Sequence, residues 1–253
     1  MSVAVKVLDH GIVRLVEHMG SDLSIVRNAR VSYDAEWRAG EDEGSDTKLI
    51  NYLMKNHHTT PFEAVVFTFE VKAPIFVLRQ WHRHRTWSYN ELSARYRELP
   101  EEYYVPEPEH ITTQSADNKQ MRTSEQHPQA KHLANCMGVQ GKVAFSEYHD
   151  LLKEECPREL ARSVLPVSTY SHMFCTVDLH NLFHFLRLRL HPHAQYEIRV
   201  YAEVMLALIE PIVPVATAAF RKHVLEAPSV DELKRTIRQL EEQLAIEQPD
   251  ARK

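Results

Sequence analysis

One short segment concentrates the side chains that could bind an anion. Residues 79–97 (RQWHRHRTWSYNELSARYR) hold five arginines and two histidines against one acid, Glu91. The whole chain of 253 residues has a net charge of −5, so this segment is a local positive site in an acidic protein. Guanidinium groups bind phosphate oxygens in a two-pronged geometry. The segment therefore predicts a phosphorylated ligand, unless it is only a solvated basic loop.

Aromatic side chains interleave with these arginines and leave further interpretations open. Trp81, Trp87, Tyr89 and Tyr96 could stack on a planar ring. The same interleaving is typical of modules that bind single-stranded nucleic acid. The pI of about 6.3 argues against nucleic acid, because such domains are expected above a pI of ~9. Residues 88–91 also fit a capping box that would start a helical turn.

A second basic cluster follows Asp178, which is expected to cap a helix that ends near Leu190. Arg189 follows Phe185 at an interval of four, so its guanidinium lies on the apolar face of that helix. A buried charge without a partner is costly, which indicates an anion or a polarised ligand beside it. Arg187 falls on the other side of the helix, beside His180 and His184, and is interpreted as structural or solvent-facing.

Sixteen histidines are an unusual number and raise a histidine-rich metalloenzyme as an alternative. His180 and His184 stand four residues apart on one helix, a spacing that can chelate a metal. No HExxH motif and no cysteine at ligand spacing accompany them. The sequence therefore argues against a bound metal.

Missing motifs exclude several other chemistries. The six glycines form neither GxGxxG nor GxxxxGK[ST], so side chains must bind any phosphate. The three cysteines form no CxxC and predict reduced thiols in a cytoplasmic protein, with Cys156 structural. No apolar run reaches the ~18 residues of a membrane span. The first residues lack a signal-peptide layout, so we expect no membrane partner.

The elements around these residues predict an α+β fold rather than a doubly wound sheet. Strands are expected at 3–8, 12–16, 65–72 and 169–177. Helices are expected at 21–28, 45–54, 74–83, 131–155, 157–164, 178–190, 193–209 and 230–246. Residues 35–46 are expected to form a solvated loop that ends in a cap at Ser45 or Asp46, and residues 106–130 a mobile surface loop.

Arg83-His84-Arg85, followed after seven residues by Ser93, forms an RHR-x7-S signature, and through it the chain resembles the flavin-dependent thymidylate synthases. Further blocks similar to that family occur in the family's order over residues 1–220. They are RVSYD at 30–34, HxTPFE at 58–63, KAPIFVxRQWxRHR at 72–85, SYNELSARY at 88–96, ARxVLP at 161–166 and HAQYEIRxYA at 193–202. The sequence departs from the pattern at Asp178 and His180, where many members carry Asn and Arg.

The resemblance implies a fold and an assembly. The fold is α+β, with a mostly antiparallel twisted sheet flanked by helices. The assembly is a homotetramer whose active sites draw on several subunits. The family domain would cover residues 1–225, and residues 226–253 would form a charged C-terminal helix and tail.

The resemblance also implies a reaction, the methylation of dUMP at C5 to give dTMP. The carbon would come from 5,10-methylenetetrahydrofolate and the reducing equivalents from NADPH through non-covalently bound FAD. Tetrahydrofolate would be released. The implied partners are these small molecules, with no nucleic acid.

Matching positions carry the family's residue roles to this chain. Arg189 is the implied catalytic residue, placed against the uracil ring. The implied dUMP site comprises Gln80, Arg83, Glu91, Ser93, Arg95, Arg162 and Arg189. The implied FAD site comprises His58, Thr60, Arg83, His84, Arg85, Glu91, Asp178, His180 and His184.

Overall fold

A five-stranded antiparallel sheet forms the centre of the protein in the computed structural model, which describes residues 4–226. The strand order is β1-β2-β3-β7-β4. The strands are β1 (Val5–Val7), β2 (Gly11–Met19), β3 (Val66–Pro74), β4 (Ser88–Glu91) and β7 (Tyr170–Asp178). The longest pairing joins β3 to β7, from Val66 opposite Asp178 to Pro74 opposite Tyr170. The predicted antiparallel α+β arrangement is confirmed.

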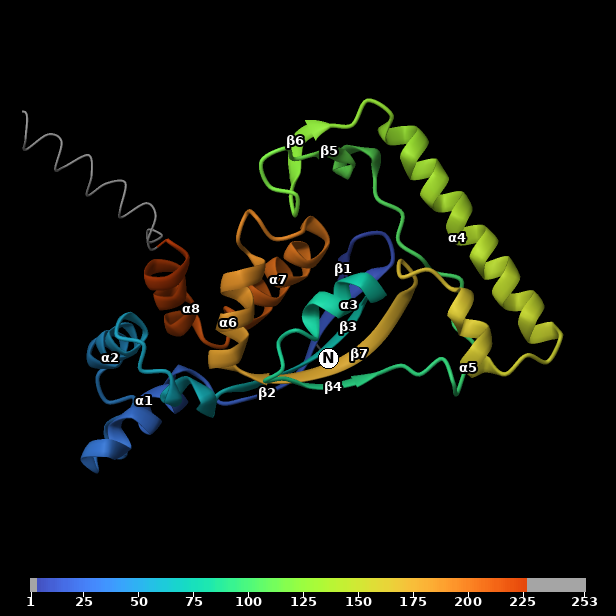
Figure 1. Ribbon diagram of the computed structural model, residues 1–253. Helices are drawn as coiled ribbons and strands as arrows, with labels where there is room; N and C mark the ends of the chain where they lie inside the picture. The colour runs from blue at the N-terminus through green and yellow to red at the C-terminus, as the bar shows by residue number, and fades with distance from the viewer. Residues whose placement is uncertain (1–3, 227–253) are drawn as a thin grey trace, which may run out of the picture.

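Strict alternation along β3 explains why this strand lies at the centre. Phe67, Phe69 and Val71 are fully buried, whereas the residues between them are half-buried. Successive side chains of a strand point to opposite faces, so the apolar set faces one layer of helices. Figure 1 shows α3 (Ile75–Trp81), α6 (Leu179–Arg189) and α7 (Tyr196–Ile209) on that side of the sheet.

The remaining helices lie at the two ends of the sheet. Beside α6 and η3 are α1 (Asp22–Arg30), α2 (Glu43–Lys55) and α8 (Pro214–Phe220), and at the opposite end are α4 (Ala130–Lys153) and α5 (Arg158–Ala161). The short turns are η1 (Val31–Tyr33), η2 (Glu36–Arg38), η3 (Thr60–Ala64), η4 (Pro108–His110), η5 (Arg162–Val164) and the π-helical η6 (Arg221–Leu225).

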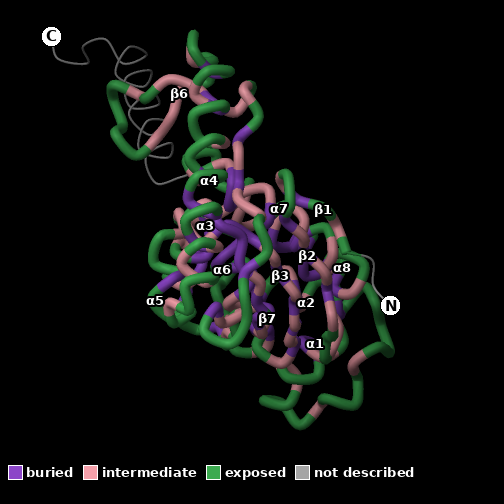
Figure 2. The backbone as a smooth tube through the Cα atoms, turned by 90° about the vertical axis from the view of Figure 1, so that its right-hand side faces the viewer, coloured by how far each residue is buried: buried purple, intermediate pink, exposed green. Residues whose placement is uncertain are grey.

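The long helix α4 stands apart from the sheet (Figure 1). In Figure 2 the buried backbone gathers around the sheet, whereas α4 and the strand β6 (Arg122–Gln126) project from it. A small cluster around Phe145 and Tyr148 attaches α4 to the body. Gly141 allows this approach, since a Cβ at that position would lie 2.3 Å from the ring of Tyr103.

Three secondary-structure predictions are wrong. Residues 88–91 form β4 rather than a helical turn, because pairing with β7 satisfies their backbone. Residues 106–130 are not a loop throughout, since they contain η4 and a hairpin of β5 (Thr112–Gln114) and β6 (Arg122–Gln126). Helix α2 begins earlier than expected, capped by Asp42, whose side chain accepts a hydrogen bond from the Ser45 amide at 3.1 Å.

Other predicted bounds shift by a few residues. The helix predicted at 74–83 ends at Trp81, and the one predicted at 157–164 is α5 followed by η5. The predicted helix at 230–246 lies outside the described residues. The predicted C-terminal segment at 226–253 also lies outside them, except for residue 226. Across residues 4–226, no helix is long and apolar enough to span a membrane.

Candidate active site

Arg189, the last residue of α6, links that helix to the basic segment that begins in the last turn of α3. Its Nε donates a hydrogen bond to Nε2 of His84 at 3.2 Å. Its Nη2 donates to the backbone oxygen of Gln80 at 3.1 Å. The guanidinium is half-buried, and burial together with the nearby charge of Arg83 lowers its pKa. The predicted position of Arg189 on an apolar helix face is confirmed by its buried neighbours Phe185 and Leu186.

His84 orients Arg189 as a neutral imidazole. Its side chain is buried, and this burial, followed by the charges of Arg189 and His184, lowers its pKa to about 4. The neutral ring can accept at Nε2 only if its proton is on Nδ1. The tautomer of His84 therefore follows from the Arg189 contact.

The buried His84 predicts a loss of stability in mild acid. Between the ordinary histidine pKa of 6.5 and about 4, the unfolded chain binds a proton that folded His84 does not. Stability should therefore decrease as pH falls through this window, by about 3 kcal/mol at most from this group. In His84→Gln, which does not titrate, we expect the decrease between pH 7 and 4.5 to shrink by about 2 kcal/mol. Urea unfolding at both pH values measures it, and an undiminished decrease would contradict a buried neutral His84.

The loop that carries Arg83, His84 and Arg85 is anchored by Tyr89 of β4. Its hydroxyl donates to the backbone oxygens of His84, at 2.8 Å, and of Trp81, at 3.2 Å. Arg83 and Arg85 remain exposed on this loop. The pairing of β4 with β7 thus holds the RHR triplet in place.

Most aromatic residues of the basic segment belong to the core and are not a stacking surface. Trp81 is fully buried and stacks on Phe185 with centroids 4.8 Å apart, while Trp87 is 6% exposed. Tyr89 is half-buried, and only Tyr96, which is 83% exposed, presents its ring to solvent. The expectation that all four rings could stack on a ligand is therefore wrong for the two tryptophans.

A second group of predicted residues lines a pocket of about 180 Å³ between α2, η3 and α6. His58, His180 and His184 face it, joined by Arg187. Arg187 is exposed and lies beside His180 and His184, as predicted, and it lines the same pocket. Apolar side chains complete the lining, among them Leu53, Met54, Phe62, Phe183 and Phe220.

The positive charges of these two neighbouring groups are not neutralised by the protein. Within residues 4–226, Arg83, Arg187 and Arg189 form no ion pair with a carboxylate. These charges repel one another: Arg83 lowers the pKa of Arg189, and after burial Arg187 lowers the pKa of His184. Such mutual repulsion is relieved when an anion binds. The arrangement is complementary to a phosphorylated ligand.

A separate group brings together Ser93, Arg95 and Arg162 around Glu159 of α5. Arg95 Nε lies 3.5 Å from a Glu159 carboxylate oxygen, and Arg162 Nε donates to the Glu159 backbone oxygen at 3.4 Å. The Arg95 amide donates to Ser93 Oγ at 3.3 Å. In the part of the chain that the structure describes, no hydrogen bond or ion pair joins this group to Arg189.

The remaining predicted site residues, Glu91, Thr60 and Asp178, belong to none of these groups. Glu91 of β4 accepts a hydrogen bond from Ser171 Oγ at 2.6 Å. Thr60 is exposed at the start of η3. Asp178 caps α6 as predicted, and its carboxylate accepts from the backbone amide of Asn181 at 2.9 Å and from its side chain at 2.6 Å.

Neither a reactive cysteine nor a metal cluster accompanies these groups in residues 4–226. Cys175 is buried in β7, and burial raises the pKa of its thiol well above the usual range. Cys136 is exposed on α4, and Cys156 packs against the small cluster of Phe145 and Tyr148. Over the same residues, no group of three or more His, Cys, Asp or Glu side chains could hold a metal ion.

Sequence reasoning missed the polar residues that support Gln80. Its side chain hydrogen bonds to Gln195, which contacts Glu197, which in turn pairs with Arg122 of the hairpin. Gln195 and Glu197 belong to the HAQYEIR block at 193–199. The similarity of this block to the family is the signal in the sequence that could have identified them.

Known proteins resemble this chain over most of its length. Residues 14–215 match the family described as thymidylate synthase complementing protein. The chain is 50% identical over 220 residues to the flavin-dependent thymidylate synthase of Treponema denticola, covering 86% of this chain and 82% of that protein. It is 49% identical over 222 residues to the one from Thermus thermophilus, covering 88% and 80%.

A solved structure agrees with these relatives. The UMP/dUMP methylase PolB from Streptomyces cacaoi, bound with 5-Br dUMP, is 38% identical to this chain with a TM-score of 0.79. The likeness covers 88% of this chain and all of that one. The chain therefore belongs to the flavin-dependent thymidylate synthases, a family of enzymes, which confirms the resemblance found in its sequence.

Proposed function

We propose that the protein methylates dUMP at C5 to give dTMP in the cytoplasm. The carbon donor is 5,10-methylenetetrahydrofolate, the reductant is NADPH acting through bound FAD, and tetrahydrofolate is released. The observation that carries this proposal is the site where Arg83, Arg187 and Arg189 gather with no carboxylate partner among residues 4–226. In an enzyme of this family, such a site suits two phosphorylated ligands, a nucleotide and a dinucleotide.

The residues present fit FAD. The pocket of His58, His180, His184 and Arg187 offers cationic and hydrogen-bonding groups for a diphosphate, and Phe183 and Phe220 offer an apolar wall for a ring. When bound, FAD would supply the hydride that reduces the transferred carbon unit. We assign its binding to residues His58, Thr60, Arg83, His84, Arg85, Glu91, Asp178, His180 and His184.

Arg189 has the geometry for a catalytic role toward the pyrimidine. His84 and the Gln80 backbone each take one of its donors, which fixes the plane of the guanidinium. Its remaining N–H groups can meet a uracil carbonyl and N3, where negative charge develops. A preorganised cation at that point stabilises the transition state electrostatically.

The group around α5 binds the phosphate of the nucleotide. Arg95 and Arg162 supply guanidinium forks, and Ser93 supplies a hydroxyl beside them. Gln80, Arg83 and Glu91 complete the proposed nucleotide contacts. Burial keeps the thiol of Cys175 protonated, and we propose that the uracil ring is activated without a thiolate.

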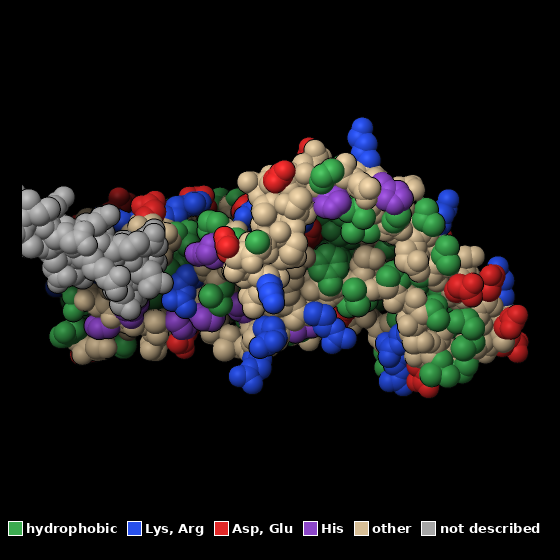
Figure 3. All heavy atoms as spheres, turned by 45° about the horizontal axis from the view of Figure 1, so that its top comes forward, with side chains coloured by type: hydrophobic (Ala, Val, Ile, Leu, Met, Phe, Trp, Pro, Cys, Tyr) green, Lys and Arg blue, Asp and Glu red, His purple; other side chains and the backbone are tan. Residues whose placement is uncertain are grey.

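We further propose that the protein is a homotetramer and that each active site combines groups from different subunits. Within the described part of the chain, no hydrogen bond or ion pair joins the Arg189 group to the Arg162 group, which supports their meeting across an interface. Helix α4 carries Met137, Val139 and Val143 at 47%, 54% and 50% exposure, an unusual apolar surface for a monomer. Figure 3 shows hydrophobic side chains in the hollow between the hairpin and α4, a pocket of about 540 Å³.

The visible absorption spectrum of the purified protein, before and after addition of dUMP, tests this proposal. We expect a flavin spectrum that shifts when the nucleotide binds, because both ligands share one site. A colourless protein that also fails to take up added FAD would contradict the proposal. The spectrum would then favour the nucleic-acid-binding or metalloenzyme alternatives.

A further inference from the structure

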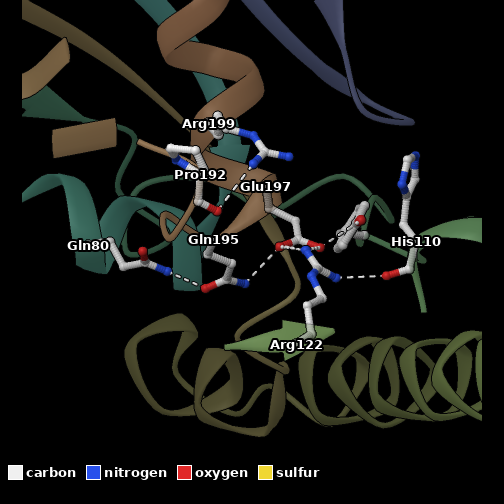
Figure 4. Close-up of polar contacts among 8 residues, drawn as sticks. Gln80, His110, Arg122, Pro192, Gln195, Glu197 and Arg199 are labelled. Atoms are coloured by element: carbon white, nitrogen blue, oxygen red, sulfur yellow. Dashed lines mark hydrogen bonds and ion pairs between the residues drawn. The ribbon is translucent and has the colours of Figure 1, made fainter. Parts of the chain in front are cut away.

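A chain of hydrogen bonds ties the β5–β6 hairpin to Gln80 (Figure 4). Nη2 of Arg122, the first residue of β6, lies 3.0 and 2.9 Å from the two carboxylate oxygens of Glu197. Glu197 also accepts from the Tyr104 hydroxyl at 3.2 Å and from Gln195 Nε2 at 2.8 Å. Gln195 Oε1 in turn accepts from Gln80 Nε2 at 2.5 Å.

Glu197 is the buried anchor of this chain. Its side chain is 4% exposed, and burial of a carboxylate is costly unless charge and hydrogen bonds compensate it. Arg122 supplies the charge, and its Nη1 donates to the His110 backbone oxygen at 2.8 Å, which fixes the guanidinium. The position of Glu197 in the first turn of α7 adds a favourable interaction with the helix dipole.

The charge of Glu197 fixes the direction of both amides that follow it. An ionised carboxylate only accepts hydrogen bonds, so Gln195 must turn its NH2 group toward Glu197. The Oε1 of Gln195 then faces Gln80 and accepts a hydrogen bond from the Gln80 NH2 group. The Oε1 of Gln80 is left outside the chain of bonds, as an acceptor for a ligand.

We propose that Glu197 is a positioning residue for nucleotide binding, which acts through Gln195 to set the orientation of the Gln80 amide. This inference rests on the proposed function, in which Gln80 contacts dUMP. We call the hydrogen-bonded chain from Glu197 through Gln195 to Gln80 the relay. Arg189 donates to the Gln80 backbone rather than to its side chain, so loss of the relay leaves that contact in place. The effect therefore falls on dUMP affinity and KM, with kcat changed less than about twofold.

A double-mutant cycle on dUMP affinity tests the relay. Calorimetry on the FAD-loaded enzyme would compare Glu197→Gln, Gln80→Ala and the double variant, since Gln at 197 keeps the shape but can donate as well as accept. We expect each single variant to weaken dUMP binding about three- to tenfold. The double variant should bind no more weakly than Gln80→Ala alone, because the relay has lost its endpoint.

Two further variants keep the test decisive. Gln195→Met breaks the relay without changing the buried ion pair, and it should show the same non-additivity with Gln80→Ala even if Glu197→Gln folds poorly. Asp46→Asn is the matched control, since Asp46 is also a buried carboxylate that pairs with an arginine. Its Oδ1 lies 2.7 Å from Nη2 of Arg30, away from the relay. It should lower stability without changing dUMP affinity.

The outcomes separate the relay from the function beneath it. If Gln80→Ala leaves dUMP affinity unchanged, the nucleotide contact of Gln80 is wrong and the relay is overturned with it. If Gln80→Ala weakens binding but the effects of Glu197→Gln or Gln195→Met multiply with it, only the relay is overturned.

Discussion

Replacement of Arg189 with alanine should lower kcat by a factor of about 10²–10³ while the protein still folds and still binds FAD. The substitution removes a guanidinium that is half-buried and held in a fixed plane by His84 and Gln80. Charge that develops on the uracil ring would then lack its preorganised partner. Steady-state turnover at saturating dUMP measures the loss, and the flavin spectrum reports cofactor retention.

The control for this prediction is Arg221→Ala. The side chain of Arg221 is 43% exposed, and its Nη2 lies 3.3 Å from a Glu210 carboxylate oxygen, so its removal costs a surface ion pair and little else. Its kcat should equal that of the wild type. An Arg189→Ala enzyme with unchanged turnover at saturating nucleotide would refute the catalytic role of Arg189.

Two variants that are inactive alone should restore activity when they share one assembly. Arg162→Ala removes a proposed phosphate contact near α5, and Arg189→Ala removes the group on α6. If each site takes one group from each of two subunits, random mixing leaves about a quarter of the sites with both arginines intact. Co-expression of the two variants should therefore recover up to about a quarter of wild-type activity.

The complementation result depends on where the two groups meet. A double variant that carries both substitutions in every chain is the matched control and should stay inactive. Recovery would place the two arginines on different subunits. Co-expressed variants that assemble together but remain inactive would contradict sites shared in this way.

Local patterns predicted much of this fold and the position of its key arginine. Alternation over 65–72 identified β3, and the spacing of Arg189 from Phe185 placed a guanidinium on a buried helix face, as the structure confirms. Asp178 was recognised as the cap of α6 because an N-cap acts within one turn. Each of these features is set by neighbours a few residues away in the chain.

Features set by distant partners were not predictable in this way. Residues 88–91 satisfy a local capping pattern, but pairing with β7 prevails, and the short, polar strands of the hairpin carry no clear alternation. The tryptophans beside the arginines are buried by α6 and α7, which lie far along the chain. Likewise, the partners in the Glu197 relay are up to 115 residues apart.

Turnover of dUMP tests the central claim most directly. The purified enzyme would be incubated with dUMP, 5,10-methylenetetrahydrofolate, NADPH and FAD, and the products separated by chromatography. We predict dTMP and tetrahydrofolate in equal amounts, with no reaction when NADPH is left out. Formation of dihydrofolate in place of tetrahydrofolate, or no dTMP from a protein that binds both FAD and dUMP, would contradict the proposed function.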